Sequence, residues 1–165
     1  MSFRPIFILI FLFLFSCTNK KAEYTPLQKV DPYKVYQEGF SAFEKGDYFF
    51  AQKKFLEAEL NMEKVEFAAK ASIMASYALY SINFYDEALE NLNRFIKKYP
   101  KNKNVIYAHY LITIIFFEQI ADEKKDMEPL IKTKNKIDFF LKEYPDSEYA
   151  IDLKFKRDLI INQIA

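Results

Sequence analysis

Two stretches of this chain repeat the same short pattern of turn, aromatic and small residues 37 positions apart. The segment from Gly46 to Ala51 aligns with the segment from Asn83 to Ala88, so that Tyr48 corresponds to Tyr85. Apolar residues around both segments recur with the period of an α-helix. Self-similarity at a fixed spacing is the signature of stacked helical units, each of which buries its apolar face against its neighbours. The sequence therefore predicts an all-α fold built by repetition.

The spacing is close to the period of about 34 residues that tetratricopeptide repeats (TPRs) have, with two helices in each unit. Small residues in these repeats let the two helices cross closely, and Gly39 takes this place on the first helix. Pro100 closes the second unit. The second helices carry small or apolar residues at matching places, namely Ala51, Phe55 and Ala58, then Ala88, Leu92 and Phe95. We therefore expect a right-handed superhelix of TPR type with about three and a half repeats.

Helical periodicity and short turns rich in Asn, Asp, Gly and Pro predict helices over residues 32–45, 48–60, 64–81, 85–98, 104–120, 130–143 and 147–163. They form one domain over residues 32–165, with repeats at about 32–63, 64–101 and 102–146 and a partial repeat at 147–165. Residues 121–129 are charged and are expected to form an exposed loop. Asp47 and Asp146 follow turns and are expected to cap the next helix. Since the last helix lacks a partner, it either caps the stack or belongs to an incomplete copy of a longer protein, and we expect the second.

The N-terminus has the layout of a secretory signal, with Arg4, an apolar run at residues 6–15, and then Ser16 and Cys17. The run is shorter than the about 20 apolar residues of a membrane-spanning helix. Residues 14–17, Leu-Phe-Ser-Cys, resemble the bacterial lipobox, in which the cysteine is acylated and becomes the first residue of the mature protein. We expect a signal peptide at residues 1–16, lipidation at Cys17 and a polar, lipidated tether at 17–31. The alternative is an uncleaved anchor with an incidental cysteine.

Composition excludes several classes of function. The formal net charge of +1 argues against electrostatic binding of nucleic acid. With one cysteine and one histidine, His109, the chain has no Cys-based zinc cluster, no two-histidine metal site and little for acid–base catalysis. Two glycines cannot form a phosphate-binding glycine loop. We expect no enzymatic activity, no metal and no cofactors, and we expect His109 at the surface or partly packed.

The order of lipobox, polar tether and degenerate TPRs resembles the BamD family of outer-membrane assembly lipoproteins. Residues 88–100, with Ala88, Leu92, Arg94-Phe95-Ile96 and Tyr99-Pro100, resemble the end of the family's second repeat. The tyrosine-rich residues 104–110 resemble the opening of its third repeat, and residues 144–150 (Tyr-Pro-Asp-Ser-Glu-Tyr-Ala) are very similar to the end of that repeat. The resemblance covers residues 14–165. The family normally has more repeats than this chain supplies, and its C-terminal repeats are a main docking surface for the barrel insertase.

This resemblance implies a non-catalytic lipoprotein scaffold of the outer-membrane β-barrel assembly complex, anchored by its lipid and facing the periplasm. The implied partners are the barrel insertase, its accessory lipoproteins and unfolded outer-membrane protein precursors, whose C-terminal strands end in aromatic residues. Thr18, directly after the lipidated cysteine, favours sorting to the outer membrane. The membrane contact is then made through the N-terminal lipid.

The repeat register places an aromatic-rich, uncharged row on the first helices, which line the concave face of a TPR superhelix. Apolar pockets that take aromatic side chains would suit the implied precursors. The predicted peptide-binding groove consists of Tyr33, Tyr36, Phe40, Phe43, Ile73, Tyr77, Tyr80, Tyr107, Leu111 and Ile114. The alternative is that these side chains only pack between helices or against the tether.

Two other functions share parts of this pattern. A periplasmic TPR coordinator of the Tol–Pal, cell-division or peptidoglycan machinery would have the same fold and similar Tyr-Pro-x-Ser motifs. Such proteins usually lack the lipid and carry an N-terminal coiled coil, and no heptad stretch precedes Asp31. An enzyme acting on peptidoglycan would need a convergent acid–base pair that the sequence does not show.

Overall fold

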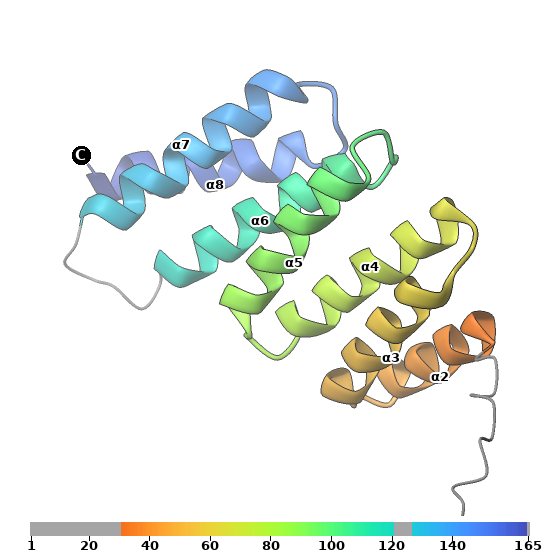
Figure 1. Cartoon of the computed structure of the whole chain (residues 1–165). Helices are drawn as coiled ribbons and strands as arrows, with labels where there is room; N and C mark the ends of the chain where they lie inside the picture. Colours follow the sequence, from red (N-terminus) through yellow and green to blue (C-terminus); the bar gives the residue numbers. More distant parts are fainter. Residues whose placement is uncertain (1–30, 121–126, 165) are drawn as a thin grey trace, which may run out of the picture.

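The computed structural model describes residues 31–120 and 127–164, which form seven α-helices (Figure 1). Their bounds are α2 (Pro32–Glu44), α3 (Tyr48–Asn61), α4 (Val65–Tyr80), α5 (Tyr85–Lys98), α6 (Val105–Ile120), α7 (Met127–Glu143) and α8 (Ala150–Ile164). No helix within these ranges is long and apolar enough to cross a bilayer. The signal peptide, Cys17 and nearly all of the expected tether lie outside the described residues.

The main contacts join helices that are consecutive in the chain, as Figure 1 shows. The pairs α2–α3, α4–α5 and α6–α7 follow one another, and α8 packs against α7. Buried side chains form clusters shared between neighbouring pairs, one within α2 to α4, one within α4 to α6 and one within α6 to α8. A stack in which each unit contacts only its neighbours is the architecture of a helical repeat protein. The predicted all-α, TPR-like fold is therefore confirmed.

The turns inside the first two helix pairs are copies of each other. Gly46 and Asn83 lie 37 residues apart and both have a left-handed backbone, with φ of 79° and 59°. Glycine and asparagine adopt this conformation at the least cost, which explains their use in the repeated pattern. Equivalent hydrogen bonds close both turns: Gly46 N–H to Phe43 O (3.0 Å) and Asp47 N–H to Ala42 O (2.9 Å), then Asn83 N–H to Tyr80 O and Phe84 N–H to Leu79 O (both 3.0 Å).

The small and apolar residues predicted at the helix crossings lie in the core. On the first helix of the first pair, Gly39 lies against Phe55 of α3, and a Cβ atom at Gly39 would be 3.1 Å from two atoms of the ring. A larger side chain would push α2 away from α3, so the expected small residue at this crossing is confirmed. The fully buried positions are Ala51, Phe55 and Ala58 on α3 and Ala88, Leu92 and Phe95 on α5.

The helix limits differ from the predicted ones most in the third repeat. Helix α7 begins at Met127 rather than at Leu130, so the expected loop at residues 121–129 is wrong for its last three residues. Helix α8 begins at Ala150, three residues later than predicted. Asp146 is exposed in the turn before it, and the turn is closed instead by Ser147, whose Oγ accepts from the Tyr149 N–H at 3.3 Å. The predicted cap at Asp146 is therefore wrong.

The cap at Asp47 is confirmed, because its Oδ1 atom accepts a hydrogen bond from the Phe50 N–H at 3.2 Å. Replacing Asp47 with alanine is expected to lower the free energy of unfolding by about 1 kcal/mol, since a helix N-terminus loses its side-chain acceptor. The measurement is urea unfolding followed by far-ultraviolet circular dichroism. Asp146→Ala is the matched control and should change stability by less than about 0.5 kcal/mol. Equal losses in the two variants would contradict this assignment.

Candidate functional site

Five aromatic side chains form a continuous row, which we call the aromatic ladder. It runs across the first helix of each repeat, and we call these first helices the inner helices. Its members are Phe43 on α2, Tyr77 on α4, Tyr107 and Tyr110 on α6, and Tyr149 just before α8. The Tyr77 ring lies 5.6 Å from Phe43 and 6.4 Å from Tyr107, between ring centroids. Tyr107 lies 5.8 Å from Tyr149, which stacks on Tyr110 at 4.4 Å. The ladder therefore crosses every junction between repeats in the described chain.

Two further tyrosines widen the ladder beside Tyr77. The Tyr80 ring stacks on Tyr77 at 5.9 Å, and both Tyr80 and Tyr85 donate hydrogen bonds to the Glu118 carboxylate, at 2.7 and 2.8 Å. Burial and the hydrogen bond to Glu118 raise the pKa of Tyr80 well above its usual range. The shared carboxylate ties the second repeat to the end of α6 and keeps the phenol protonated.

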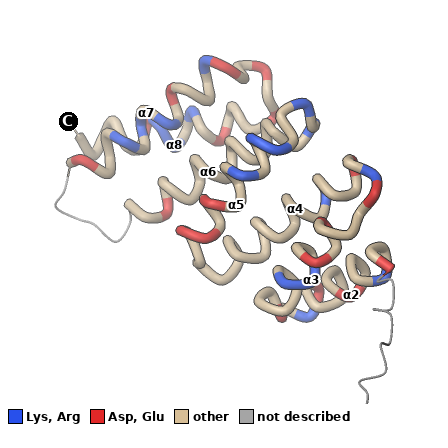
Figure 2. Tube along the Cα trace, in the orientation of Figure 1, with Lys and Arg blue, Asp and Glu red and all other residues tan. Residues whose placement is uncertain are grey.

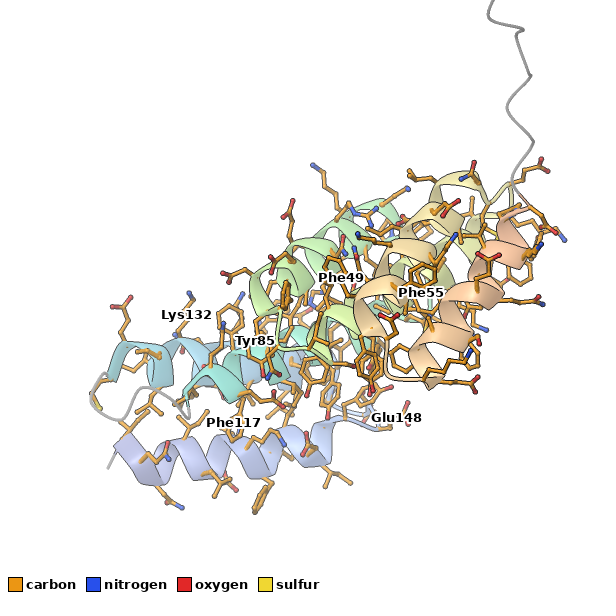
Figure 3. All side chains as sticks on the ribbon, turned by 90° about the horizontal axis from the view of Figure 1, so that it is seen from below. Phe49, Phe55, Tyr85, Phe117, Lys132 and Glu148 are labelled. Carbon is orange, nitrogen blue, oxygen red and sulfur yellow. The ribbon has the colours of Figure 1, made fainter. Side chains whose placement is uncertain are left out.

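The far end of the ladder borders a pocket. Tyr110 donates to Asp152 at 3.0 Å, and burial together with this bond raises the pKa of Tyr110 to about 12. The pocket has a volume of about 330 Å³ and is lined by Lys103, Asn104, Ile106, Tyr107, Ser147, Glu148 and Tyr149. In Figure 3 Glu148 lies at the turn that leads into α8. The ladder thus ends in a hollow with a cation and an anion at its rim.

The structure brings four of the ten predicted groove residues into this site: Phe43, Tyr77, Tyr80 and Tyr107. Three others lie on α2 and are not members of the ladder. Tyr33 contacts Phe67 at 5.4 Å, Tyr36 packs on Phe55 at 5.3 Å, and Phe40 is 42% exposed.

The placement of the remaining three residues in the groove is wrong, because their side chains are buried. Ile73 is 6% exposed, Leu111 2% and Ile114 7%, and all three lie within the shared hydrophobic clusters. Side chains this deep cannot line an open groove. Helices α4 and α6 are apolar on most of their circumference, so periodicity alone does not separate the buried face from the face that carries the tyrosines.

Tyr110, Tyr149, Tyr85 and Glu118 belong to the site but were not predicted. Tyr110 lies one helical turn from Tyr107, so its place on the same face was available in the spacing. No spacing in the sequence indicates that Glu118 accepts hydrogen bonds from Tyr80 and Tyr85, since the two tyrosines are 38 and 33 residues away.

The inner helices that carry the ladder hold few charges, as Figure 2 shows for α4 and α6. Helix α6 contains one charged residue, Glu118. Helix α4 contains two, Glu66 and Lys70, both in its first half. Among residues 31–120 and 127–164, no group of three or more His, Cys, Asp or Glu could hold a metal ion. The site offers rings, hydroxyl groups and a few carboxylates, which suits binding rather than bond-making chemistry.

His109 lies on another face of α6, where it is half-buried between Phe139 at 5.8 Å and Tyr144 at 5.6 Å. Burial, and then the charge of Lys136, lower the pKa of its imidazole below the usual value. The expectation of a partly packed histidine is confirmed.

A buried ion cluster fixes the first two repeats against each other. The Glu59 carboxylate on α3 is 1% exposed and accepts two bonds from Arg94 on α5, at 2.9 and 2.8 Å. Lys98 donates to it at 3.0 Å and Tyr99 at 2.9 Å. Burial alone raises the pKa of this carboxyl, but the bonds from Arg94, Lys98 and Tyr99 outweigh it and lower the pKa to about 2.

Comparison with known proteins connects this fold to a family. A family model described as YfiO, outer membrane lipoprotein, matches residues 28–165. The chain belongs to the YfiO family. A relative from Caulobacter vibrioides, named outer membrane protein assembly factor BamD, is 31% identical over 150 residues. A Rickettsia prowazekii protein of the same name is 28% identical over 158 residues. The predicted resemblance to BamD proteins is therefore confirmed.

The two alignments cover most of this chain but only part of the relatives. They span 90% and 96% of this chain, and 49% and 62% of the Caulobacter and Rickettsia proteins. The family model includes all seven helices of the described chain, so the ladder and the Glu59 cluster both lie inside the YfiO region.

Proposed function

We propose that this YfiO-family chain is a non-catalytic scaffold for the assembly of β-barrel proteins in the outer membrane. Its relatives are named outer membrane protein assembly factors, which supports this role. In this proposal the chain is anchored by a lipid on Cys17, faces the periplasm, and contacts the barrel insertase and its accessory lipoproteins. The family description as outer membrane lipoproteins supports the anchor.

The observation that carries the proposal is the aromatic ladder. The strands of a transmembrane barrel alternate apolar and polar residues and carry aromatic residues near both membrane interfaces, so an unfolded precursor presents aromatic side chains along its chain. Rings that enter the ladder would meet other rings at centroid separations of about 4.5–7 Å, and each such pair contributes about 0.5–1.5 kcal/mol beyond burial. The oxygen atoms of the tyrosine hydroxyl groups can also accept hydrogen bonds from the backbone N–H groups of an unfolded segment.

The electrostatics of the ladder suit this ligand. Burial raises the pKa of Tyr107 above its usual range, so the central ring of the ladder stays uncharged under physiological conditions. The inner helices α4 and α6 carry few charges (Figure 2). A neutral, aromatic surface binds many different apolar segments and does not select one charge pattern, as a scaffold for varied precursors requires.

The test is binding of a labelled peptide from the C-terminal strand of an outer-membrane barrel protein, measured by fluorescence anisotropy. The double variant Tyr77→Leu/Tyr107→Leu keeps apolar volume at both positions but removes the two central rings. We expect its Kd to rise at least about tenfold, which corresponds to about 1.4 kcal/mol. Phe139→Leu is the matched control, because Phe139 is an exposed aromatic residue outside the ladder on α7.

Circular dichroism establishes that both variants keep their helix content. Equal affinity of the parent chain and the ladder variant for the peptide would contradict the proposal. So would an equal loss in Phe139→Leu, because the binding would then depend on exposed aromatic residues in general.

A further inference from the structure

One end of the stack, formed by the first repeat and the start of the second, exposes large apolar side chains from three helices, which we call the end patch. Leu60 is 80% exposed, Val65 69%, Tyr33 44% and Phe67 39%. Tyr33 lies at the start of α2, Leu60 at the end of α3, and Val65 and Phe67 at the start of α4. Figure 1 shows these three helix ends on the same side of the first repeat.

The end patch is an organised surface. The Tyr33 and Phe67 rings meet edge to face at 5.4 Å, and the Lys64 ammonium lies 5.9 Å from the centre of the Phe67 ring. An aliphatic pair, two aromatic rings and a lysine that extends over a ring form the combination found where proteins meet a lipid–water interface. These side chains lie at helix ends and are not members of the aromatic ladder, so the precursor-binding role leaves them unexplained.

The charges beside the end patch exclude a contact based on electrostatic attraction alone. Figure 2 shows charges of both signs at this end of the molecule. In the described part of the chain, the exposed charged residues one or two positions in sequence from a member of the end patch are Lys34, Lys64, Asp31, Glu63 and Glu66. Anionic lipids attract clusters of lysine and arginine, which are absent from this short list. The contact that fits is shallow insertion of apolar side chains among lipid headgroups.

The sequence places this end next to the expected anchor. Helix α2 begins directly after Asp31, which is 14 residues from Cys17. A fully extended chain of that length spans at most about 50 Å. A lipid at Cys17 would therefore keep the start of α2 within about 50 Å of the bilayer. Helix α8 lies at the opposite end of the stack of helices (Figure 1).

We propose that the end patch of Tyr33, Leu60, Val65 and Phe67 rests on the bilayer in which the N-terminal lipid is anchored. The proposal rests on the lipid anchor of the proposed function. A second membrane contact sets the orientation of the first repeat relative to the bilayer, which one attachment point does not do. The ladder then has a fixed direction relative to the membrane.

The experiment uses environment-sensitive dyes on single new cysteines in the full-length chain, purified from membranes and reconstituted into phosphatidylcholine vesicles. Cys17 is the one native cysteine, and in the proposed anchor its thiol carries the lipid, so a second cysteine can be labelled selectively. Leu60→Cys and Val65→Cys report on the end patch. Ile151→Cys is the matched control, because Ile151 is 79% exposed on α8.

We expect the emission of the dye at positions 60 and 65 to shift to the blue on vesicles and to be quenched by lipids that carry a nitroxide in the headgroup region. The dye at position 151 should show neither effect. Mass spectrometry and vesicle flotation measure the lipid anchor separately, so failure of the anchor is distinguishable from failure of the end patch.

Three results would overturn the proposal. Floating, lipidated protein with unshifted dyes at 60 and 65 would mean that the end patch faces water. A blue shift that is the same without vesicles would mean that other residues of the chain cover it. A shift that appears only when a partner protein is added would mean that the end patch is a protein-docking surface.

Discussion

Replacing Glu59 with glutamine is expected to lower the free energy of unfolding by about 3 kcal/mol at neutral pH, one of the largest effects of a single conservative change in this chain. The amide keeps the shape of the side chain but removes the buried charge that Arg94, Lys98 and Tyr99 share. A carboxyl whose pKa falls from 4.5 to about 2 on folding gains about 3 kcal/mol from the folded environment. Breaking one side of a buried ion pair has a cost of this order.

The measurement is chemical unfolding of the parent chain and of Glu59→Gln. Glu57→Gln is the matched control on the same helix, since Glu57 pairs with Lys54 at 3.2 Å in a half-exposed position. Surface pairs of this kind contribute at most about 1 kcal/mol. A loss below about 1 kcal/mol in Glu59→Gln would contradict the role given to this cluster.

The same cluster makes a pH prediction with a definite sign. The folded-state pKa of Glu59 is lower than its unfolded value, so its contribution is fully present above about pH 4.5 and is lost as the pH falls toward about 2. The stability difference between the parent chain and Glu59→Gln should therefore shrink through this window. A difference that stays constant from pH 6 to about pH 2 would contradict it.

Replacing Phe55 with alanine is expected to lower the free energy of unfolding by about 3–5 kcal/mol, the usual range for removing a fully buried ring. Phe55 is 0% exposed, packs against Tyr36 at 5.3 Å and lies under Gly39. Its loss leaves a cavity where α2, α3 and α4 meet. Thermal and chemical unfolding of both proteins measure the change.

The control for Phe55→Ala is Phe49→Ala, on the same helix. Phe49 is 51% exposed on α3, with the Lys53 ammonium 4.5 Å from its ring centre. Both phenylalanines are labelled in Figure 3. Phe49→Ala should lower stability by less than about 1 kcal/mol, the value of an exposed cation–π contact. Equal losses from both substitutions would show that Phe55 is not the core residue that the repeat pattern predicts.

The sequence predicted the parts of the fold that depend on local chemistry. Gly46 and Asn83 terminate helices through the same left-handed turn, and this requirement is visible as a repeated motif. The buried series on α3 and α5 follows from the same 37-residue shift, because equivalent positions in stacked repeats contact equivalent neighbours.

The parts that were missed depend on contacts between residues far apart in the chain. The partners of Glu59 lie 35 to 40 residues away in the chain, so the residues around Glu59 in the sequence do not indicate that its carboxylate is buried. Leu111 and Ile114 were assigned to the groove because α6 is apolar all round, and only packing decides which side faces α7. The start of α7 was placed too late, since Pro129 in its first turn is compatible with a helix.

In the proposed function, the polar contacts between repeats hold the aromatic ladder in place. The aromatic ladder crosses the junctions between repeats, and the Glu59 cluster and the tyrosine pair on Glu118 fix two of those junctions. A ligand that spans several repeats binds more tightly when the repeats are already held in place, because less conformational freedom is lost on binding.

The most direct test of the scaffold role is purification of the tagged full-length protein from its own host in mild detergent, with the co-purifying chains identified by mass spectrometry. The proposed function predicts recovery of a large outer-membrane barrel protein with periplasmic domains, together with barrel precursors whose amount falls in Tyr77→Leu/Tyr107→Leu. Recovery of Tol–Pal, cell-division or peptidoglycan components, without any barrel protein, would contradict it.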